Sequence, residues 1–341
     1  MKLKVTSAEV AERAGVSQSA VSRVFTPGAS ASKKTIEKVR KAAAELGYRP
    51  NVLARAMVSG RSRIIGLVVA YLENQFYPIV LEKLSNALQE QGYHILIFTA
   101  PNSTDGIDAV IQDLMDYQVD GIVAASVSLS SDLAERATQA GIPVVLFNRG
   151  QDNSPFVEVT SDNIAGGRQV AEFLLEAGHE RIAHISGWQG SSTGRERKQG
   201  FNAALAEAGA ASIATLDGMY NRDVAMACTE TLLRDHNPDA IFVGNDHMAF
   251  AVIDRLRAHG VVVGQDISVI GYDDVPMASW GAYDLTTIRQ PVNRMVDATV
   301  SALMSHIENP QNAEPRREAI EGPLIVRGSA RKPKGWTNEG I

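Results

Sequence analysis

Several features that would point to other protein classes are missing from this sequence. It contains a single cysteine in 341 residues, Cys228, which excludes a disulfide framework and is typical of a reducing compartment. No run of about 18 apolar residues occurs, which excludes a transmembrane helix of ordinary length. The polar, basic N-terminus has no apolar signal-peptide core. These absences predict a chain that works in the cytoplasm.

Patterns that would mark a metal, a nucleotide cofactor or a catalytic site are also missing. The seven histidines are scattered without H-x-x-x-H or paired-cysteine spacing, so no metal site is indicated. Glycines 187, 190 and 194 do not form G-x-G-x-x-G, and no Walker-type lysine follows them. We therefore expect no cofactor and no catalytic residues.

One pattern keeps an enzyme alternative open. GSSTG (190–194) matches the nucleophile-elbow motif G-x-S-x-G, centred on Ser192. In that elbow the serine follows a strand directly, whereas here 187–189 separate it from the preceding apolar run. The segment also has an ordinary loop composition. A hydrolase is therefore the weaker interpretation.

The charge of the chain is divided unevenly. Its net charge is −6, but residues 1–63 hold 13 Lys and Arg against 4 Asp and Glu, about +9. The remaining residues hold 20 Lys and Arg against 35 Asp and Glu, a net charge of about −15. A basic head on an acidic body is expected when only the head touches phosphate.

Residues 5–25, VTSAEVAERAGVSQSAVSRVF, have the pattern of a helix-turn-helix. Thr6 or Ser7 can cap a first helix, Gly15 permits the left-handed turn that ends it, and Ser17 can cap a second helix. The second helix has an apolar stripe on one face. Its other face carries the side chains that contact base edges and phosphates in a major groove, namely Gln18, Ser19, Ser22 and Arg23. The alternative is a small helical hairpin that packs on a larger domain.

The next segments favour DNA binding. Ser32 can cap a third helix over 33–46, whose apolar line closes a three-helix core and whose lysines stay outside. After Pro50, residues 51–57 could form one or two apolar turns. Such a piece is too short to be stable as an isolated helix and needs a partner to fold.

From residue 64 onward, short β-branched runs alternate with amphipathic helices. This alternation predicts parallel sheets covered on both faces, and the pattern restarts near residue 156, which predicts two doubly wound lobes. Ligands bind beyond the carboxyl ends of such strands. Polar residues at predicted strand ends, Asn148, Asn245 and Asp273 among them, could be ordinary turn and cap residues. Because three such ends face one predicted cleft, we favour a site for a polar ligand.

With these motifs in order, the chain resembles the lactose-repressor (LacI-type) family of transcription regulators from about residue 5 to about 329. The resemblance lies in the head, the hinge YRPNVLAR, and the body motifs GHERIAHISG, RERKQGF, GNDHMA, VIGYDD and LTTIRQP. It implies an α/β fold with an N-terminal helix-turn-helix domain and a two-lobed, periplasmic-binding-protein-like body with doubly wound parallel sheets.

The resemblance also implies the domain boundaries. Residues 1–60 would form the DNA-binding domain, with a hinge helix at 51–58, and 61–341 the effector-binding and dimerisation domain. Lobe one would comprise about 62–160 and 291–322, and lobe two about 161–290 and 323–329.

By motif position, the family's DNA contacts fall on residues of the head and hinge. Bases would be contacted by Gln18, Ser19 and Arg23, and phosphates by Thr6, Ser17, Ser22, Ser32 and Thr35. The hinge, beginning at Asn51, would fold only on DNA and place Leu53, Ala54 and Met57 in the minor groove. Met57 stands where the family usually has a leucine wedge, which predicts a softer wedge. Thr26 replaces a frequent asparagine and puts one backbone contact in doubt.

The matching effector positions lie in the cleft. They are Arg197, Tyr220, Asn245 and Asp273, with Phe76, Asn148, Trp280 and Gln290 as further lining. For Phe76 and Trp280, packing at the lobe interface is the alternative. Hydrogen-bonding groups around an aromatic face favour a sugar or sugar derivative over a purine.

The function implied is a regulator, a repressor, whose affinity for a near-palindromic double-stranded operator is set allosterically by a small polar effector. The tail has no leucine heptads, which predicts a homodimer; its place would be the cytoplasm, on the nucleoid, with no membrane partner. The other class is a solute-binding protein with the same two-lobed body. That class would need an export signal and no helix-turn-helix.

Overall fold

The computed structural model describes residues 5–26, 29–49, 61–70, 72–99, 104–127, 130–309 and 314–336. The chain divides into two compact units, Met1–Arg63 and Ile64–Ile341, here called the head and the body. The predicted hinge contacts Asn51, Leu53, Ala54 and Met57 lie outside the described residues. Within the described part, no helix is long and apolar enough to cross a bilayer.

The head is a bundle of three helices whose ends are set by local capping. They are α1 (Ser7–Ala14), α2 (Gln18–Phe25) and α3 (Lys33–Leu46). Thr6, not Ser7, caps α1, and a capping box with Glu9 closes its first turn. Gly15 ends α1 in the left-handed region, with φ 64°. Ser17 and Ser32 cap α2 and α3, as their positions predicted.

A small apolar core holds the three head helices together. Val10, Val21 and Val39, one from each helix, are fully buried, and alanines of α1 and α3 pack around them. Because the apolar residues recur at helical spacing, each helix buries one stripe and leaves its polar face in water. The exposed face of α2 is therefore available for a partner.

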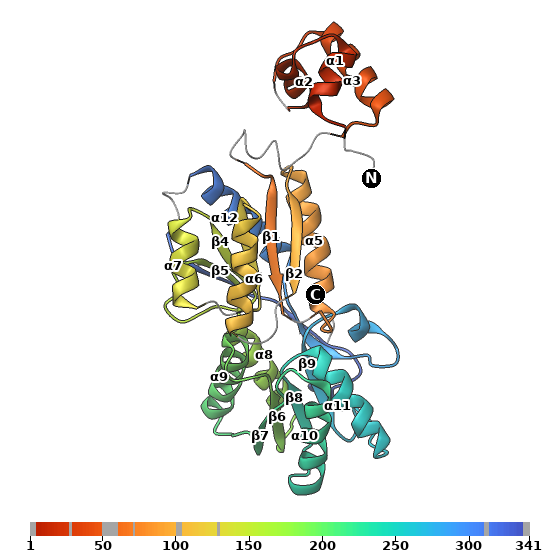
Figure 1. The fold of residues 1–341 in the computed structure, drawn as a ribbon. Coiled ribbons are helices and arrows are strands. Elements are labelled where there is room, and N and C mark those ends of the chain that lie inside the picture. Colours follow the sequence, from red (N-terminus) through yellow and green to blue (C-terminus); the bar gives the residue numbers. More distant parts are fainter. Residues whose placement is uncertain are drawn as a thin grey trace. The chain divides into compact units, whose positions relative to one another are not determined.

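The body contains two six-stranded sheets among the described residues (Figure 1). The first has the order β11-β5-β4-β3-β1-β2, all parallel, and the second the order β12-β10-β9-β8-β6-β7, in which only the β10–β12 pair is antiparallel. The strands of the first sheet are β1 (Ile64–Val69), β2 (His94–Thr99), β3 (Gly121–Ala125), β4 (Val144–Phe147), β5 (Val157–Ser161) and β11 (Arg317–Ile320). Those of the second are β6 (Ile182–Ser186), β7 (Ala214–Asp217), β8 (Ala240–Val243), β9 (Ser268–Asp273), β10 (Thr286–Arg289) and β12 (Leu324–Ile325).

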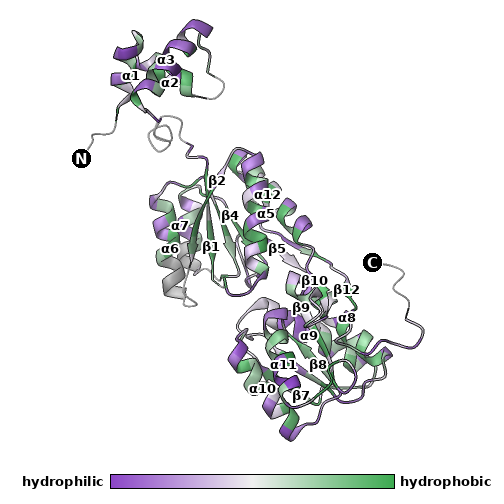
Figure 2. Cartoon of the chain, turned by 90° about the vertical axis from the view of Figure 1, so that its right-hand side faces the viewer, coloured by the Kyte–Doolittle hydropathy of each residue, from purple (hydrophilic) through white to green (hydrophobic). Residues whose placement is uncertain are grey.

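Helices cover both faces of each sheet and so bury the near-continuous apolar strands. In lobe one, α5 (Phe76–Glu90) and α12 (Val292–Glu308) cover one face, and α6 (Thr104–Asp116) and α7 (Ser131–Gln139) the other. In lobe two, α8 (Asn163–Glu176) and α9 (Ser192–Glu207) lie opposite α10 (Arg222–Asp235) and α11 (Asp246–Ala258), and a short 3-10 turn, η1 (Pro276–Ser279), follows β9. Figure 2 shows the consequence: the strands are green, whereas the helices are purple on their outer sides.

The chain passes between the two lobes three times. It crosses between β5 and α8, between β10 and α12, and between β11 and β12. Because all three connections are only a few residues long, they can act as a hinge that lets the lobes change their mutual orientation. The body is therefore built from two sheets whose strands are not contiguous in sequence.

Candidate functional site

The exposed face of α2 carries four of the side chains predicted to contact DNA. Gln18, Ser19, Ser22 and Arg23 are all exposed. Gln18 donates from Nε2 to Ser7 Oγ at 2.8 Å, and Arg23 donates from Nε to the Ser19 carbonyl at 3.4 Å. Local contacts thus hold both long side chains along the helix surface, where they stay accessible.

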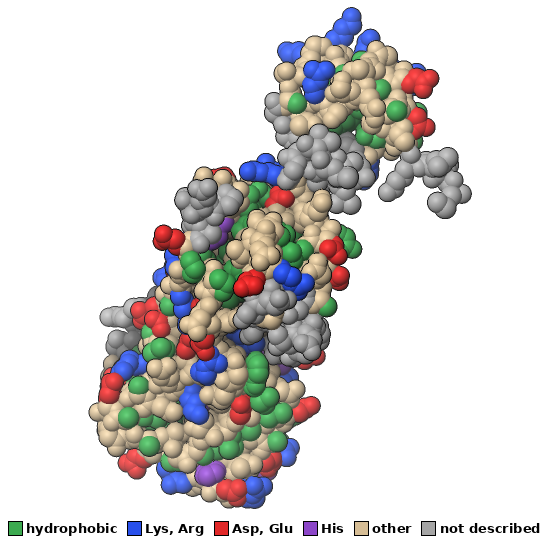
Figure 3. Space-filling model, turned by 60° about the vertical axis from the view of Figure 1, so that its left-hand side comes forward, with side chains coloured by type: hydrophobic (Ala, Val, Ile, Leu, Met, Phe, Trp, Pro, Cys, Tyr) green, Lys and Arg blue, Asp and Glu red, His purple; other side chains and the backbone are tan. Residues whose placement is uncertain are grey.

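The predicted phosphate contacts lie at helix starts. Thr6, Ser17 and Ser32 are exposed N-cap residues, and Thr35 is half-buried with its hydroxyl 2.8 Å from Ser32 Oγ. Helix N-termini carry partial positive charge, which suits phosphate. In Figure 3 the head shows several blue Lys and Arg side chains and a few red acidic ones.

A cavity with a largely polar lining lies between the two lobes of the body. Its lining combines residues from both lobes. Lobe one contributes Glu73, Asn74, Tyr77, Asn148 and Arg149, and lobe two contributes Thr193, Arg197, Tyr220, Asn245, His247 and Asp273. Most of these follow the carboxyl ends of strands, where ligands of open parallel sheets bind.

Three of the lining residues have a backbone conformation that ordinary residues rarely adopt. Asn148 has φ 68°, Tyr220 has φ 55° and Asp273 has φ 128°. Such conformations cost about 1–3 kcal/mol each and persist where the surrounding structure imposes them, often at ligand sites. Tyr220 also depends on Gly187, because a Cβ there would lie 2.0 Å from the tyrosine ring.

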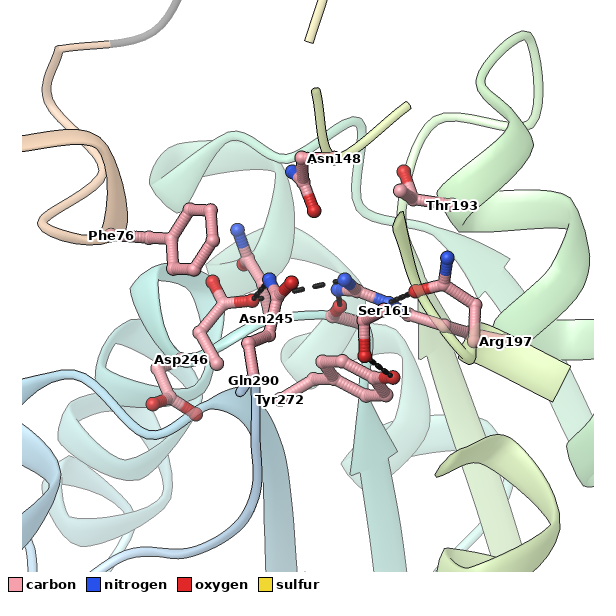
Figure 4. A network of polar contacts seen from close by, with 12 residues as sticks. Phe76, Asn148, Ser161, Thr193, Arg197, Asn245, Asp246, Tyr272 and Gln290 are labelled. Atoms are coloured by element: carbon pink, nitrogen blue, oxygen red, sulfur yellow. Dashed lines mark hydrogen bonds and ion pairs between the residues drawn. The ribbon is translucent and has the colours of Figure 1, made fainter. Parts of the chain in front are cut away.

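A buried Arg197–Asp273 pair forms the floor of the cavity. Figure 4 shows Arg197 beside the Tyr272 ring. Arg197 is 3% exposed, and its guanidinium lies 3.6 Å from the centre of the Tyr272 ring. It donates to Asn163 Oδ1 at 2.9 Å and to the Gly244 carbonyl at 2.6 Å, and its NH2 lies 3.8 Å from Asp273 Oδ1. The position of Arg197 is therefore determined by contacts on every side.

Asp273 is held from both lobes. Gln290 donates to its Oδ1 at 2.7 Å, and Asn74 of lobe one donates to its Oδ2 at 3.4 Å. Burial raises the pKa of Asp273, and the nearby Arg197 opposes that rise. A ligand that contacts Asp273 would therefore act directly on a contact between the lobes.

Asp246 connects the elements that carry the residues of this floor. It is fully buried and accepts hydrogen bonds from the Thr287 hydroxyl at 2.6 Å and the Val275 N–H at 3.0 Å. It thereby ties the start of α11 to β10 and to the loop after β9, next to Asn245 and Asp273. Burial, together with the charge of Asp273, raises the pKa of Asp246 to about 8.

The raised pKa of Asp246 predicts a pH-dependent stability. Its pKa is about 8 in the folded protein, against an ordinary value of 3.8. Between these values only the folded state holds the proton, so the free energy of unfolding falls as pH rises, by up to about 1.4 kcal/mol per unit. Below the lower value and above the higher one this contribution is flat. Denaturant titrations from pH 5 to 8 should show this slope in the wild type and a shallower one in Asp246→Asn; parallel profiles would contradict it.

The lobe-one side of the cavity is a second polar network. Asn148 donates from Nδ2 to Ser126 Oγ at 2.9 Å and to the Tyr77 hydroxyl at 3.2 Å, and Tyr77 donates to Ser126. Burial raises the pKa of the Tyr77 hydroxyl, which keeps it protonated. Asn148 Oδ1 is buried and has no hydrogen-bond partner among the described residues. This oxygen is an acceptor for a ligand.

The structure brings five of the predicted effector residues together in the cavity lining: Asn148, Arg197, Tyr220, Asn245 and Asp273. Gln290 is outside the lining but bonds to Asp273. Phe76 is 1% exposed and belongs to an apolar cluster, and Trp280 is 55% exposed; neither lines the cavity.

Six lining residues were not among the predicted effector positions. They are Glu73, Asn74, Tyr77, Arg149, Thr193 and His247. A signal existed for two of them. Arg149 directly follows a predicted strand end, and Thr193 lies within GSSTG.

GSSTG forms the start of α9 and not a nucleophile elbow. Ser191 caps the helix by accepting from the Gly194 N–H at 3.1 Å, and Ser192 Oγ accepts from the Gly150 N–H at 3.0 Å. In the described part of the chain, no cluster of three or more His, Cys, Asp or Glu could hold a metal ion.

A three-helix DNA-reading head and a two-lobed body with a polar cavity together define a ligand-responsive DNA-binding regulator. The family model described as "Bacterial regulatory proteins, lacI family" matches residues 6–51, and that of the periplasmic binding protein-like domain matches 171–330. The chain belongs to the LacI family of transcriptional regulators and is not an enzyme.

Similar proteins cover nearly the whole chain. The transcriptional regulator CelR of Thermobifida fusca is 35% identical, over 94% of this chain and 96% of its own. The transcriptional repressor PurR of Vibrio campbellii is 30% identical, over 96% and 99%. The structure of the lac repressor dimer bound to operator and an anti-inducer matches with a TM-score of 0.86 and 27% identity, over 96% of this chain and 99% of that one. The structure of a CelR–cellobiose complex matches with a TM-score of 0.72 and 33% identity, over 96% of this chain and 100% of that one. The solute-binding alternative does not account for the head that these proteins share.

Proposed function

We propose that this chain is a repressor that binds a near-palindromic operator as a homodimer and is controlled by a saccharide-type effector in the cavity between its lobes. The proposal keeps residues 1–60 as the DNA-binding domain, with its hinge helix at 51–58, and 61–341 as the effector and dimerisation domain. It acts in the cytoplasm, where the operator is. The Arg197–Asp273 floor of the cavity is the observation that carries the proposal.

The DNA side of the proposal follows from what α2 exposes. Gln18, Ser19 and Arg23 would read base edges, while Thr6, Ser17, Ser22, Ser32 and Thr35 would contact phosphates. Residues Asn51, Leu53, Ala54 and Met57 would enter the minor groove when the hinge folds on DNA. Two identical heads related by a two-fold axis require two half-sites of matching symmetry.

The cavity has the chemistry that a polyhydroxylated ligand needs. Each sugar hydroxyl is both a donor and an acceptor. The lining offers carboxylate oxygens on Asp273, an unpartnered amide oxygen on Asn148 and a guanidinium on Arg197. Tyr220 adds an aromatic face, against which an apolar sugar face can pack. The similar CelR chain in complex with cellobiose supports this ligand class.

Control of DNA binding would depend on the mutual orientation of the two lobes. Direct contacts join them in this structure: Asn74 with Asp273, Gly150 with Ser192, and Arg317 of β11 with Glu196 of α9 at 2.7 Å. A ligand that touches both lobes binds one mutual orientation better than another and so shifts their equilibrium. Lobe one follows the head directly in sequence, so such a shift would change how readily the hinge between them folds on DNA.

Calorimetry with a panel of sugars, sugar acids and purines tests the effector class. We expect at least one saccharide-type compound to bind the full-length chain and to change its affinity for operator duplex. Binding of purines alone would overturn the saccharide assignment. Selection of duplexes from a random pool tests the DNA side, and recovery of asymmetric sites with a single half-site would contradict the proposed dimer.

A further inference from the structure

Arg149 places a buried positive charge on the lobe-one wall of the cavity. It follows β4 immediately after Asn148, whose left-handed backbone turns the chain at this point. Arg149 is 6% exposed, lines the cavity and donates from NH1 to the Ser126 carbonyl at 2.9 Å. A buried guanidinium in a ligand cavity is costly unless anionic or polar groups stabilise it.

Two aromatic side chains of lobe two hold the same guanidinium. Its carbon lies 5.6 Å from the centre of the Tyr220 ring and 5.9 Å from that of Trp188. Cation–π contacts and the bond to Ser126 keep the planar group in one place. These contacts keep the positive charge of Arg149 at a fixed place in the lining, where it can attract a carboxylate.

The start of α9 lies beside Arg149. The Gly150 N–H donates to Ser192 Oγ at 3.0 Å, and Thr193, in the first turn of α9, lines the cavity and bonds to the Tyr220 hydroxyl at 3.0 Å. The first turn of a helix presents partial positive charge, and α9 is 16 residues long. Arg149 and this helix start therefore make one side of the cavity attractive to an anion.

The remaining lining offers acceptors and neutral groups. Asp273 is paired with Arg197 and provides carboxylate oxygens, and Asn148 Oδ1 is a buried acceptor with no hydrogen-bond partner among the described residues. Glu73, the other acid of the lining, is exposed, so water screens its charge. The cavity is therefore polarised, with an anion-attracting side and a hydroxyl-binding side.

We infer that the effector is a sugar acid, a polyhydroxylated carboxylate whose carboxyl group binds Arg149 beside the start of α9 and whose hydroxyls bind Asp273 and Asn148. The inference rests on the proposed saccharide-type effector and names its chemical class. Neither Arg149 nor Thr193 was among the effector positions that motif matching provided.

Matched pairs of neutral and acidic sugars test this assignment on the full-length chain. Titration calorimetry would compare D-glucose with D-glucuronate and D-gluconate, D-galactose with D-galacturonate, and cellobiose with cellobionate. D-Glucose 6-phosphate tests a phosphate as the anion. In the pair that binds, the acid should bind about tenfold or more tightly than its neutral partner, as expected for a charge-assisted bond.

Variants assign the preference to Arg149. Arg149→Gln should reduce the acid-to-neutral ratio to within about twofold, and Arg149→Lys should retain part of it, because lysine keeps the charge but not the fork. Arg195→Gln is the matched control. Arg195 is an exposed arginine of α9 that pairs with Asp152 at 3.4 Å outside the cavity, so its loss should leave the ratio unchanged.

The outcomes separate this inference from the proposed function. Equal or tighter binding of the neutral sugars overturns the sugar-acid assignment and leaves the saccharide-type effector standing. Binding of the phosphate ester without any carboxylate overturns it as well. If Arg149→Gln still prefers the acid, Arg149 is not the residue that binds the carboxyl group. Binding of purines only overturns the proposed effector class itself. The wild-type ratios decide the ligand class even if Arg149→Gln does not fold.

Discussion

Replacing Arg197 with glutamine is expected to abolish effector binding while leaving the head able to bind operator. Arg197 is the buried cation at the floor of the cavity, and its donors are distributed over Asn163, the Gly244 carbonyl and Asp273. Glutamine removes the charge and the fork, so Asp273 keeps its buried carboxylate without its main cation. Removing one partner of a buried pair costs about 3–5 kcal/mol.

This loss has two measurable consequences. Effector affinity should fall at least a hundredfold, since about 2.8 kcal/mol corresponds to two factors of ten. In a reporter strain the variant should repress without responding to the effector. Thermal unfolding should show a lower midpoint for the body, because the unpaired Asp273 destabilises the fold.

A surface arginine provides the matched control for Arg197. Arg168 lies on the neighbouring helix α8 and pairs with Glu207 at 2.6 Å, but both side chains are substantially exposed. Arg168→Gln should therefore leave both stability and effector binding nearly unchanged. If Arg197→Gln binds the effector as the wild type does, the cavity is not the effector site.

Replacing Arg23 with alanine is expected to remove operator discrimination. Arg23 is exposed on α2, and only its Nε contacts the Ser19 carbonyl, so the rest of its fork can reach a guanine edge. Loss of a bidentate base contact costs about 1–3 kcal/mol, or about 5- to 150-fold. Affinity for operator duplex should fall by that factor, whereas affinity for random duplex should change little.

Two further variants serve as controls for Arg23→Ala. Arg13→Ala removes an exposed arginine that pairs with Glu45 of α3 at 2.5 Å, so it matches the change in charge without touching α2. Ser17→Ala removes a proposed phosphate contact and the cap of α2, and it should weaken operator and random duplex alike. An equal loss on both duplexes for Arg23→Ala would mean that Arg23 contacts only phosphate.

Local sequence patterns predicted most of the helices and strands but not all of their ends. The apolar stripes of the head led to the three helices that the structure shows. In the body, the apolar spacing predicts a helix that starts at Ile79 and another that starts near Glu196. The structure begins these helices earlier, α5 at Phe76 and α9 at Ser192. Ser191 caps α9 from within a stretch whose glycines and serines resemble a loop. The short strand β7 was not predicted, because a four-residue run has little periodicity to detect.

Some residues of the candidate cavity could be predicted from the sequence and others could not. Asn245 and Asp273 follow apolar strands, and that position alone suggested a site. Tyr77, in contrast, lies in the second position of a helix and has no motif, yet its hydroxyl contacts Asn148, 71 residues away. Phe76, next to it, was a candidate for the lining, but it is buried in an apolar cluster and does not line the cavity, although its ring faces the polar network in Figure 4.

By itself, the sequence determined the class of this protein: a basic helix-turn-helix head on an acidic body of two doubly wound lobes. Those properties depend on charge, capping residues and hydrophobic periodicity, which act over a few neighbouring residues. Only the tertiary structure decided that Arg149 of lobe one lies against Tyr220 and Trp188 of lobe two. Such neighbours arise because three crossings between the lobes bring strand ends from two sheets to one cavity, and no local pattern encodes that distance.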